Sequence, residues 1–502
     1  TTSHGQMNSD MDLLFLSDRD KTQNGRELDL GHFLVSADGE HLGFRVGHHA
    51  IAGESLLFDG YQKRGISASA DVTPLNSELA LFGMSSIDLA GTKGGLGIND
   101  SDNRYTGATW ATQALVTETS GVSLTAGYLA GRESEAGFAN FQSGNEQVNE
   151  GRAWSLGMDS YWFRSQVQLS LERAFSRYDF DGEDGPDKAT SGDAWSALAI
   201  YAPALPDAAP DWYLGAEMTE TGTSYRSLGH RFLPGDRRLK RLFSQLVVDK
   251  WTLNGVYGVE ENNLDRIESL AVTETVRKSL TAAYTDYEPT DPGSVFYWLG
   301  TPSYSLNWER ADARDLRTPV GFLANDTRSR STTFTAQFLA ADWQWALGYS
   351  YQEFDDWADV QIDSRTRSPF ASASVTISER LTLTPSWSRQ DTLNRDFDTR
   401  AREDIFALGA DFALIPERLL GNLTLNVNVN RARNDPFFVQ DNTRRYLAGQ
   451  LTWRAMLPER NRSGLDVSLS FNKQDYEDAV DSANDQDDYQ VFLAVRTSGD
   501  VF

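Results

Sequence analysis

The side chains that most often carry out chemistry are sparse and scattered in this chain. Its 502 residues include no cysteine and only six histidines, which excludes disulfides, thiolate metal sites and cysteine nucleophiles. The HExxH, GxSxG and GxxxxGK[ST] patterns of zinc proteases, serine hydrolases and phosphate loops do not occur. We therefore expect a protein that is not an enzyme and that binds no cofactor.

One acidic segment has the composition of a calcium loop. Asp179, Asp181, Asp184 and Asp187 lie in a segment that is rich in Asp and Gly, and such carboxylates can offer several oxygens to Ca²⁺. The spacing lacks the final Glu of an EF-hand loop, so a solvated loop is the preferred interpretation. The acidic stretch 475–488 is interpreted in the same way.

The elements that carry these residues show alternation with a period of two. From 422 to 430, Asn and Thr alternate with Leu and Val, whereas a helix with this sequence would scatter its apolar residues around its surface. The same pattern recurs in 343–352, 381–388 and 465–472. No run approaches the ~20 apolar residues of a membrane-spanning helix. The pattern predicts an all-β protein.

The alternation predicts two faces of a sheet, one towards a watery lumen and one towards lipid. The residues predicted to face the lumen are Asn422, Thr424, Asn426, Asn428, Asn430, Gln344, Ser350, Thr382, Thr384, Ser386, Ser388, Ser468 and Ser470. The residues predicted to face lipid are Leu423, Leu425, Val427, Val429, Trp343, Trp345, Leu347, Leu381, Leu383, Trp387, Val467, Leu469 and Phe471.

A soluble β-sandwich or propeller would also alternate, but three features favour a membrane barrel. The polar face consists of hydroxyls, amides and glycine, as suits a wet lumen. The alternations run for roughly 10–15 residues, whereas soluble strands average ~5–6. Aromatic residues such as Trp343 and Trp357 gather towards predicted strand ends, and Trp and Tyr favour the membrane interface. We predict a transmembrane, antiparallel, up-and-down β-barrel.

The turns indicate the size of this barrel. Short turns are expected at 340–342, 378–380, 415–418 and 457–460, and longer charged loops at 355–367, 389–403, 433–445 and 474–488. Short periplasmic turns and longer extracellular loops are typical of outer-membrane barrels. Counting hairpins gives about 22–24 strands. One barrel domain over 1–502 is expected, with 1–10 as an N-terminal tail or the remnant of a preceding segment.

The C-terminus carries a resemblance to a class of proteins. Tyr489, Val491, Leu493 and Val495 alternate, and the chain ends in Phe502, which falls on the opposite face. This end resembles that of Gram-negative outer-membrane barrel proteins, which commonly finish in an amphipathic strand with a terminal Phe. The resemblance implies a location in the outer membrane, with its lipid and lipopolysaccharide as partners, and it indicates no specific family.

One dense basic cluster stands out in a chain whose net charge is −26. It comprises Arg237, Arg238, Lys240 and Arg241. It can be a site for an anionic passenger, or a junction of loop and strand that touches lipopolysaccharide phosphates, and the second interpretation is favoured. The strongly acidic balance argues against a nucleic-acid partner.

The predicted barrel size bears on function. Barrels of ~16–18 strands already enclose a channel, and those of ~22 carry a plugged lumen. Alternation begins by 27–37, which leaves no room for the N-terminal plug found in TonB-dependent receptors. We expect a large-bore transport or secretion channel whose lumen is occluded by loops, by an N-terminal domain outside this sequence, or by a protein partner. The alternatives are a sheath around a partner such as a multihaem cytochrome, and a general diffusion porin.

Overall fold

The structure is a computed structural model that describes most of the chain. Outside the description lie residues 1–5, 16–27, 61, 74–75, 88, 90–94, 136–146, 180–188, 207–209, 231, 287–292, 294–296, 298, 341, 414–421, 436–439, 457–463 and 499–502.

The described residues form 24 strands in one sheet, at the upper end of the predicted range. The first twelve are β1 Gln6–Phe15, β2 Leu28–Asp38, β3 Leu42–His49, β4 Lys63–Val72, β5 Ser77–Ser85, β6 Arg104–Val116, β7 Gly121–Glu135, β8 Gln147–Trp162, β9 Val167–Asp179, β10 Thr190–Tyr201, β11 Asp211–Thr221 and β12 Arg237–Val248. The others are β13 Trp251–Asn262, β14 Val272–Thr285, β15 Thr301–Arg317, β16 Asp326–Leu339, β17 Trp343–Asp356, β18 Ser364–Ser378, β19 Leu381–Asn394, β20 Thr399–Ala413, β21 Asn422–Asp435, β22 Gln440–Met456, β23 Gly464–Asp478 and β24 Gln486–Ser498. A short 3-10 helix, Ser482–Asn484, precedes β24.

Each strand pairs antiparallel with the next one along the chain, for example β15 with β16 and β16 with β17. Cross-strand neighbours share a face, because successive side chains point to opposite sides of a sheet. Thr333 lies opposite Ser350 and its hydroxyl donates to the Ser350 Oγ at 3.0 Å. The adjacent pair, Phe334 and Tyr349, lies on the other face, where both rings are exposed. The predicted up-and-down antiparallel order is confirmed.

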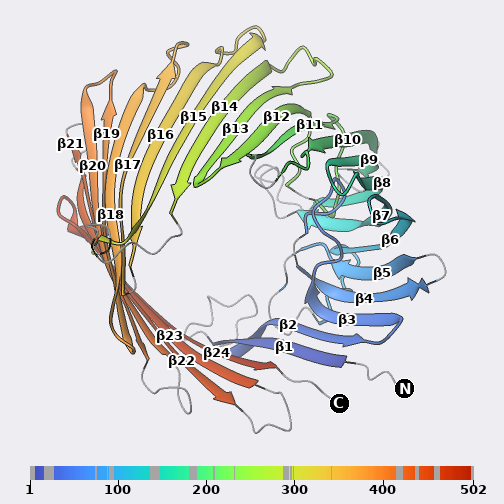
Figure 1. The fold of residues 1–502 in the computed structure, drawn as a ribbon, viewed down its shortest axis with the longest axis horizontal. Helices are drawn as coiled ribbons and strands as arrows, with labels where there is room; N and C mark the ends of the chain where they lie inside the picture. Colours follow the sequence, from blue (N-terminus) through green and yellow to red (C-terminus); the bar gives the residue numbers. More distant parts are fainter. Residues whose placement is uncertain are drawn as a thin grey trace.

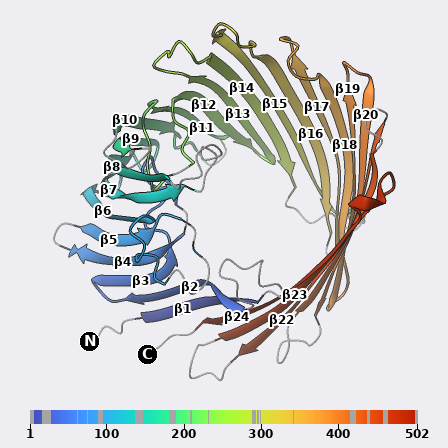
Figure 2. The same cartoon turned by 180° about the vertical axis from the view of Figure 1, so that it is seen from behind.

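The strands follow one another around a ring that encloses a wide interior (Figure 1), and the view from behind shows the same ring (Figure 2). Its two end strands, β1 and β24, are neighbours, although no ladder of hydrogen bonds pairs them among the described residues. Within the part of the chain that the structure describes, no helix has the length and apolar character that crossing a membrane would need.

The connections define two ends of the ring. The short-turn end holds tight connections such as 117–120, 163–166 and 249–250, and the long-loop end holds 50–62, 86–103 and 222–236. In the second half of the ring the predicted long loops 355–367, 389–403, 433–445 and 474–488 are wrong in extent. The connections there are only 357–363, 395–398, 436–439 and 479–485, because the charged flanks continue the strands. At the N-terminus, β1 begins at Gln6, within the segment 1–10 that was expected to be a tail.

Candidate functional site

Two long-loop connections fold into the interior of the ring, where both views show them (Figures 1 and 2). We call residues 50–60 and 222–236, without residue 231, the lumenal insert. Its apolar centre is Leu56, Leu57 and Phe58, whose side chains are buried at 5%, 0% and 7% exposure. An apolar triplet can be buried inside a wide ring only if another segment covers it, and the second half of the insert does so.

Hydrogen bonds tie the two halves of the insert together. The Tyr225 hydroxyl donates to the Leu56 carbonyl at 2.8 Å, and the Ser227 hydroxyl donates to the Leu57 carbonyl at 2.7 Å. The backbone N–H of Asp59 donates to the Gly229 carbonyl at 2.8 Å. Burial raises the pKa of the Tyr225 phenol, so it stays protonated and keeps its role as donor. Backbone carbonyls that would otherwise be orphaned in the interior are thereby satisfied.

Further contacts fix the insert to the inner wall. The Leu56 N–H donates to the Glu172 carboxylate on β9 at 3.0 Å, and the Arg226 N–H donates to the Ser176 hydroxyl at 3.1 Å. Leu57 and Phe58 belong to one apolar cluster with side chains of β5 to β9. The wall members of that cluster, which therefore point into the ring, are Phe82, Met84, Tyr105, Leu129, Ala153 and Tyr178.

Glycines on the inner wall make room for this close approach. A Cβ on Gly192 of β10 would lie 2.3 Å from the backbone nitrogen of Tyr225, and one on Gly127 of β7 would lie 2.7 Å from the Leu57 Cδ2. On β13, by contrast, a Cβ on Gly258 would meet nothing closer than 3.8 Å. Gly127 on β7 and Gly192 on β10 therefore allow the insert to pack closely against the inner wall.

A hollow of about 470 Å³ lies between the insert and the wall. Its lining includes four carboxylates, from Glu54, Glu78, Asp159 and Glu172, together with wall hydroxyls. Two of the carboxylates already accept bonds within the protein, since Glu172 holds the Leu56 N–H and Asp159 accepts from the Ser170 hydroxyl at 2.6 Å. Part of this lining is hydrophilic. Among the described residues, no group of three or more His, Asp or Glu side chains is placed to hold a metal ion.

The structure describes the acidic stretch 475–488 but only part of the acidic segment 179–187. Asp179 ends β9, while Asp181, Asp184 and Asp187 lie outside the described residues, so the calcium interpretation stays a prediction. In the stretch 475–488, the Asp478 carboxylate accepts the Val480 N–H at 2.9 Å and the Asn484 amide at 3.1 Å. These bonds shape the turn between β23 and β24.

The basic cluster is divided between the two faces of β12 and largely neutralised. Arg237 pairs with Glu260 at 2.6 Å and Arg238 with Glu220 at 2.7 Å, each across to a neighbouring strand. Arg241 pairs with Glu217. Residues adjacent in the sequence point to opposite faces of a strand, so the four cations form no single patch.

The predicted lumen-facing and lipid-facing sets lie on strands, and their assignment to lumen or lipid stays a prediction. Gln344 and Ser350 alternate on β17 with Trp343, Trp345 and Leu347. Side chains of residues 422–430 lie outside those that the structure describes, and so does the terminal Phe502. The sequence predicted that loops occlude the lumen, but it did not indicate which loops form the insert. The one local signal of the insert is the run Leu56-Leu57-Phe58, three consecutive apolar residues in the connection between β3 and β4.

No protein-family model matches this chain, and no curated protein matches it. Among solved structures, it is similar to the siderophore receptor PirA from Pseudomonas aeruginosa, with 9% identity, a TM-score of 0.48, and 99% of this chain and 80% of that chain covered. It is also similar to the FrpB iron transporter from Neisseria meningitidis, with 10% identity, a TM-score of 0.47, and 100% of this chain and 83% of that chain covered. Both TM-scores are below 0.5, so these likenesses do not assign a ligand or an activity to this chain.

Proposed function

We propose that this chain is a large-bore barrel of the Gram-negative outer membrane that forms a transport or translocation channel. The observation that carries the proposal is the ring of 24 described strands with an apolar outer face and an interior that the described loops occupy only in part. An up-and-down barrel of this size encloses an aqueous lumen wider than that of a porin of ~16–18 strands.

The outer face of the ring supports insertion in lipid. Leu280, Leu306, Phe334 and Leu347 lie on it, on four successive strands, with exposures of 47%, 40%, 45% and 50%. Monomers in water rarely expose contiguous apolar patches beyond a few hundred Å². A lipid bilayer would cover such a belt, as it does in transmembrane barrels.

An aromatic row marks one edge of this belt. At the short-turn end, aromatic rings of β13 to β17 touch from strand to strand, with centroid distances from 4.2 to 6.1 Å. The members of the row are Trp251, Tyr284, Tyr304, Phe338 and Trp345. Trp and Tyr gather where hydrocarbon meets water. Short turns are typical of the periplasmic side, so we assign the row to the periplasmic interface and the long-loop end to the cell exterior.

The interior favours a channel that passes a bulky solute or holds a partner. The insert narrows the lumen beside β5 to β10 only. Within the described residues, no comparable cluster of buried apolar side chains covers the inner face of β14 to β20. This uncovered wall also supports a second candidate, in which the barrel sheaths a protein partner such as a multihaem cytochrome. A general diffusion porin is disfavoured by the strand number.

Conductance of the purified full chain in planar bilayers tests the proposal. We expect a conductance above that of a porin monomer, and a further increase of about twofold when 51–59 is replaced by a short Gly-Ser turn, because one half of the insert is then absent and the other half, 222–236, loses its hydrogen-bond partners. Leu347→Ala, on the outer face, serves as control. A porin-sized conductance that the replacement does not change would contradict the proposal. Swelling of liposomes in neutral polyethylene glycols of graded size measures the bore.

The sheath candidate has its own measurement. Purification from native membranes, followed by the absorption spectrum of the complex, distinguishes the two candidates. A stoichiometric haem band would support the sheath, and a haem-free barrel that conducts would support the channel.

A further inference from the structure

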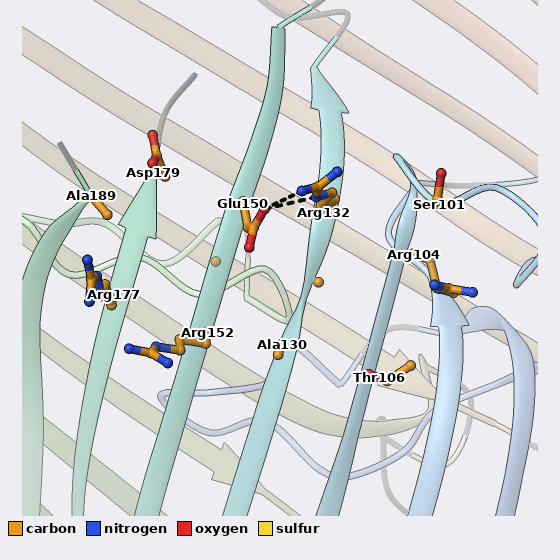
Figure 3. A pocket seen from close by; sticks show the side chains of 12 residues that line it. Ser101, Arg104, Thr106, Ala130, Arg132, Glu150, Arg152, Arg177, Asp179 and Ala189 are labelled. Carbon is orange, nitrogen blue, oxygen red and sulfur yellow. Dashed lines mark hydrogen bonds and ion pairs between the residues drawn. The ribbon is translucent and has the colours of Figure 1, made fainter. Parts of the chain in front are cut away.

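Four arginines gather on one face of β6 to β9, close to the long-loop end. Figure 3 shows Arg104, Arg132, Arg152 and Arg177 on neighbouring strands, with strands of the opposite wall behind them. The register brings them together, because Arg104 lies opposite Arg132 and Arg152 lies opposite Arg177. Four cations in this small area stand out in a chain whose net charge is −26.

These arginines point out of the ring. Arg104, Arg152 and Arg177 are each followed or preceded directly by a member of the inner apolar cluster, namely Tyr105, Ala153 and Tyr178. Neighbours in a strand point to opposite faces. Arg132 is three residues from Leu129, another inward side chain, and so shares the outer face. The cluster therefore faces the surroundings of the barrel and not its lumen.

The arginines surround a hollow of about 600 Å³ with a floor of small side chains, Thr106, Ala130 and Ala189. Two carboxylates also line it, from Glu150 and Asp179, so four cations face two anions. Arg132 pairs with Glu150 at 2.7 Å. Among the described residues, Arg152 and Arg177 have no ion pair, and their guanidinium groups are the ones most available to an incoming anion.

An apolar strip runs from this hollow towards the short-turn end on the same outer face. Tyr128 and Trp154 are cross-strand partners, exposed at 47% and 44%, and Trp154 stacks on Phe175 at a centroid distance of 4.4 Å. Leu156 continues the strip at 54% exposure. A hydrophobic surface directly beneath a cationic hollow matches an amphiphile with an anionic head.

The spacing fits the dimensions of a membrane. Arg152 and Trp162 lie on the same face of β8, and the interval between them corresponds to roughly 33 Å along a strand. At a strand tilt of ~40° this is ~25 Å along the membrane normal, close to the height of the apolar band of outer-membrane barrels. If Trp162 lies at the periplasmic interface, the arginines lie at the headgroups of the outer leaflet.

We propose that this hollow binds the phosphorylated headgroup of a lipopolysaccharide molecule, with Arg152 and Arg177 as the principal phosphate ligands. The planar guanidinium group donates paired hydrogen bonds that match phosphate oxygens. The acyl chains lie along the Trp154 and Leu156 strip. This inference rests on the proposed location in the outer membrane, and it assigns a lipid ligand to one defined part of the outer wall.

Native mass spectrometry of the full chain in a neutral detergent, with bisphosphorylated lipid A as probe, tests the site. The double variant Arg152→Gln/Arg177→Gln should lose at least about tenfold in lipid A binding, because two charge-assisted hydrogen-bonding groups are removed. The matched control is Arg314→Gln/Arg402→Gln. It removes two cations at the long-loop end of the opposite wall, where each already pairs with a carboxylate. The control should change binding by no more than about twofold.

Four further results distinguish the possible sources of the phosphate, and they distinguish failure of the lipid site from failure of the proposed function. Lipid A without phosphates should bind as weakly as the double variant. If inorganic phosphate or a deacylated headgroup bound as tightly as intact lipid A, the site would be one for soluble anions and the lipid assignment would be overturned. A wild-type chain that conducts in bilayers but binds lipid A no better than the double variant would overturn the site alone. A chain that neither inserts nor conducts would overturn the proposed function and, with it, the lipid site.

Discussion

The two halves of the ring use their inner faces in different ways. On β5 to β10 the inner face carries an apolar cluster, and residues such as Leu57, Leu129 and Ala174 are almost completely buried beneath or within the insert. On β16 to β19 the side-chain hydrogen bonds that the structure describes on the inner face run across strands. Thr333 bonds to Ser350, and Thr366 bonds to Thr392 at 2.9 Å.

Ion pairs also stabilise the long-loop end of the second half, here called its rim. Asp312 accepts from Arg310 and Arg328, and Arg395 pairs with Asp363 at 2.7 Å and also with Asp355. The antiparallel ladder is continuous in both halves. The wall therefore does not need an apolar inner face, because its backbone hydrogen bonds are satisfied between strands. Apolar burial inside the ring holds the insert in place. Mutations can therefore loosen the insert without weakening the wall.

The largest effect is expected from Leu57→Ala. This side chain is fully buried at the centre of the insert, and such truncations cost about 2–5 kcal/mol. Amide hydrogen exchange of 50–60, which reports the free energy of local opening, should accelerate accordingly. Leu347→Ala on the opposite wall should leave exchange in 50–60 unchanged. Equal protection in both variants would show that the insert is held by something other than this cluster.

Gly192→Ala should have the next largest effect, about 1–3 kcal/mol as for an overpacked site. The new methyl group would lie 2.3 Å from the Tyr225 nitrogen, which belongs to backbone. Limited proteolysis within 222–236 should become faster in this variant. Gly258→Ala on β13 adds a methyl group at ordinary van der Waals distance, 3.8 Å from the Lys240 carbonyl oxygen, and should resist protease like the wild type. If Gly258→Ala also became sensitive to protease, the proposed difference between the inner faces of the two halves would be wrong.

Tyr225→Phe should loosen the insert by about 1 kcal/mol, since it removes one hydrogen bond and leaves the Leu56 carbonyl without its donor. The ring remains to fill its buried place. Hydrogen exchange at 55–58 should therefore increase by less than in Leu57→Ala, by roughly fivefold. An unchanged rate would mean that apolar packing alone fixes the insert.

The smallest effect is expected from Arg395→Gln in the second half. Its partners Asp355 and Asp363 lie at the rim, with side chains exposed at 16% and 25%, and pairs near the surface contribute about 0–1 kcal/mol. Exchange in 395–398 should increase slightly and the difference from wild type should vanish at high salt. If the variant lost the change in gel mobility on heating that distinguishes a folded barrel from an unfolded chain, this rim network would be essential to the wall.

Much of the architecture was encoded locally. The alternation of Trp343 to Gln352 and of Leu465 to Asn472 fixes strands and their two faces, because side-chain direction in a strand depends only on parity. The long loops are shorter than predicted because charged residues do not by themselves indicate a loop. At strand ends beyond the bilayer a charged side chain can stay in the ladder and pair across it, as Arg445 does with Glu477 at 2.7 Å.

What the sequence determined by itself is the all-β class, the strand order and the alternation of polar and apolar faces, since each follows from neighbours in the chain. Only the tertiary structure decided which loops enter the ring and which cations meet. Leu57 and Ser227 lie 170 residues apart, and Arg104 and Arg177 come together only when β6 to β9 align in register. Both the insert and the arginine hollow depend on contacts between distant segments, and no local pattern specifies those contacts.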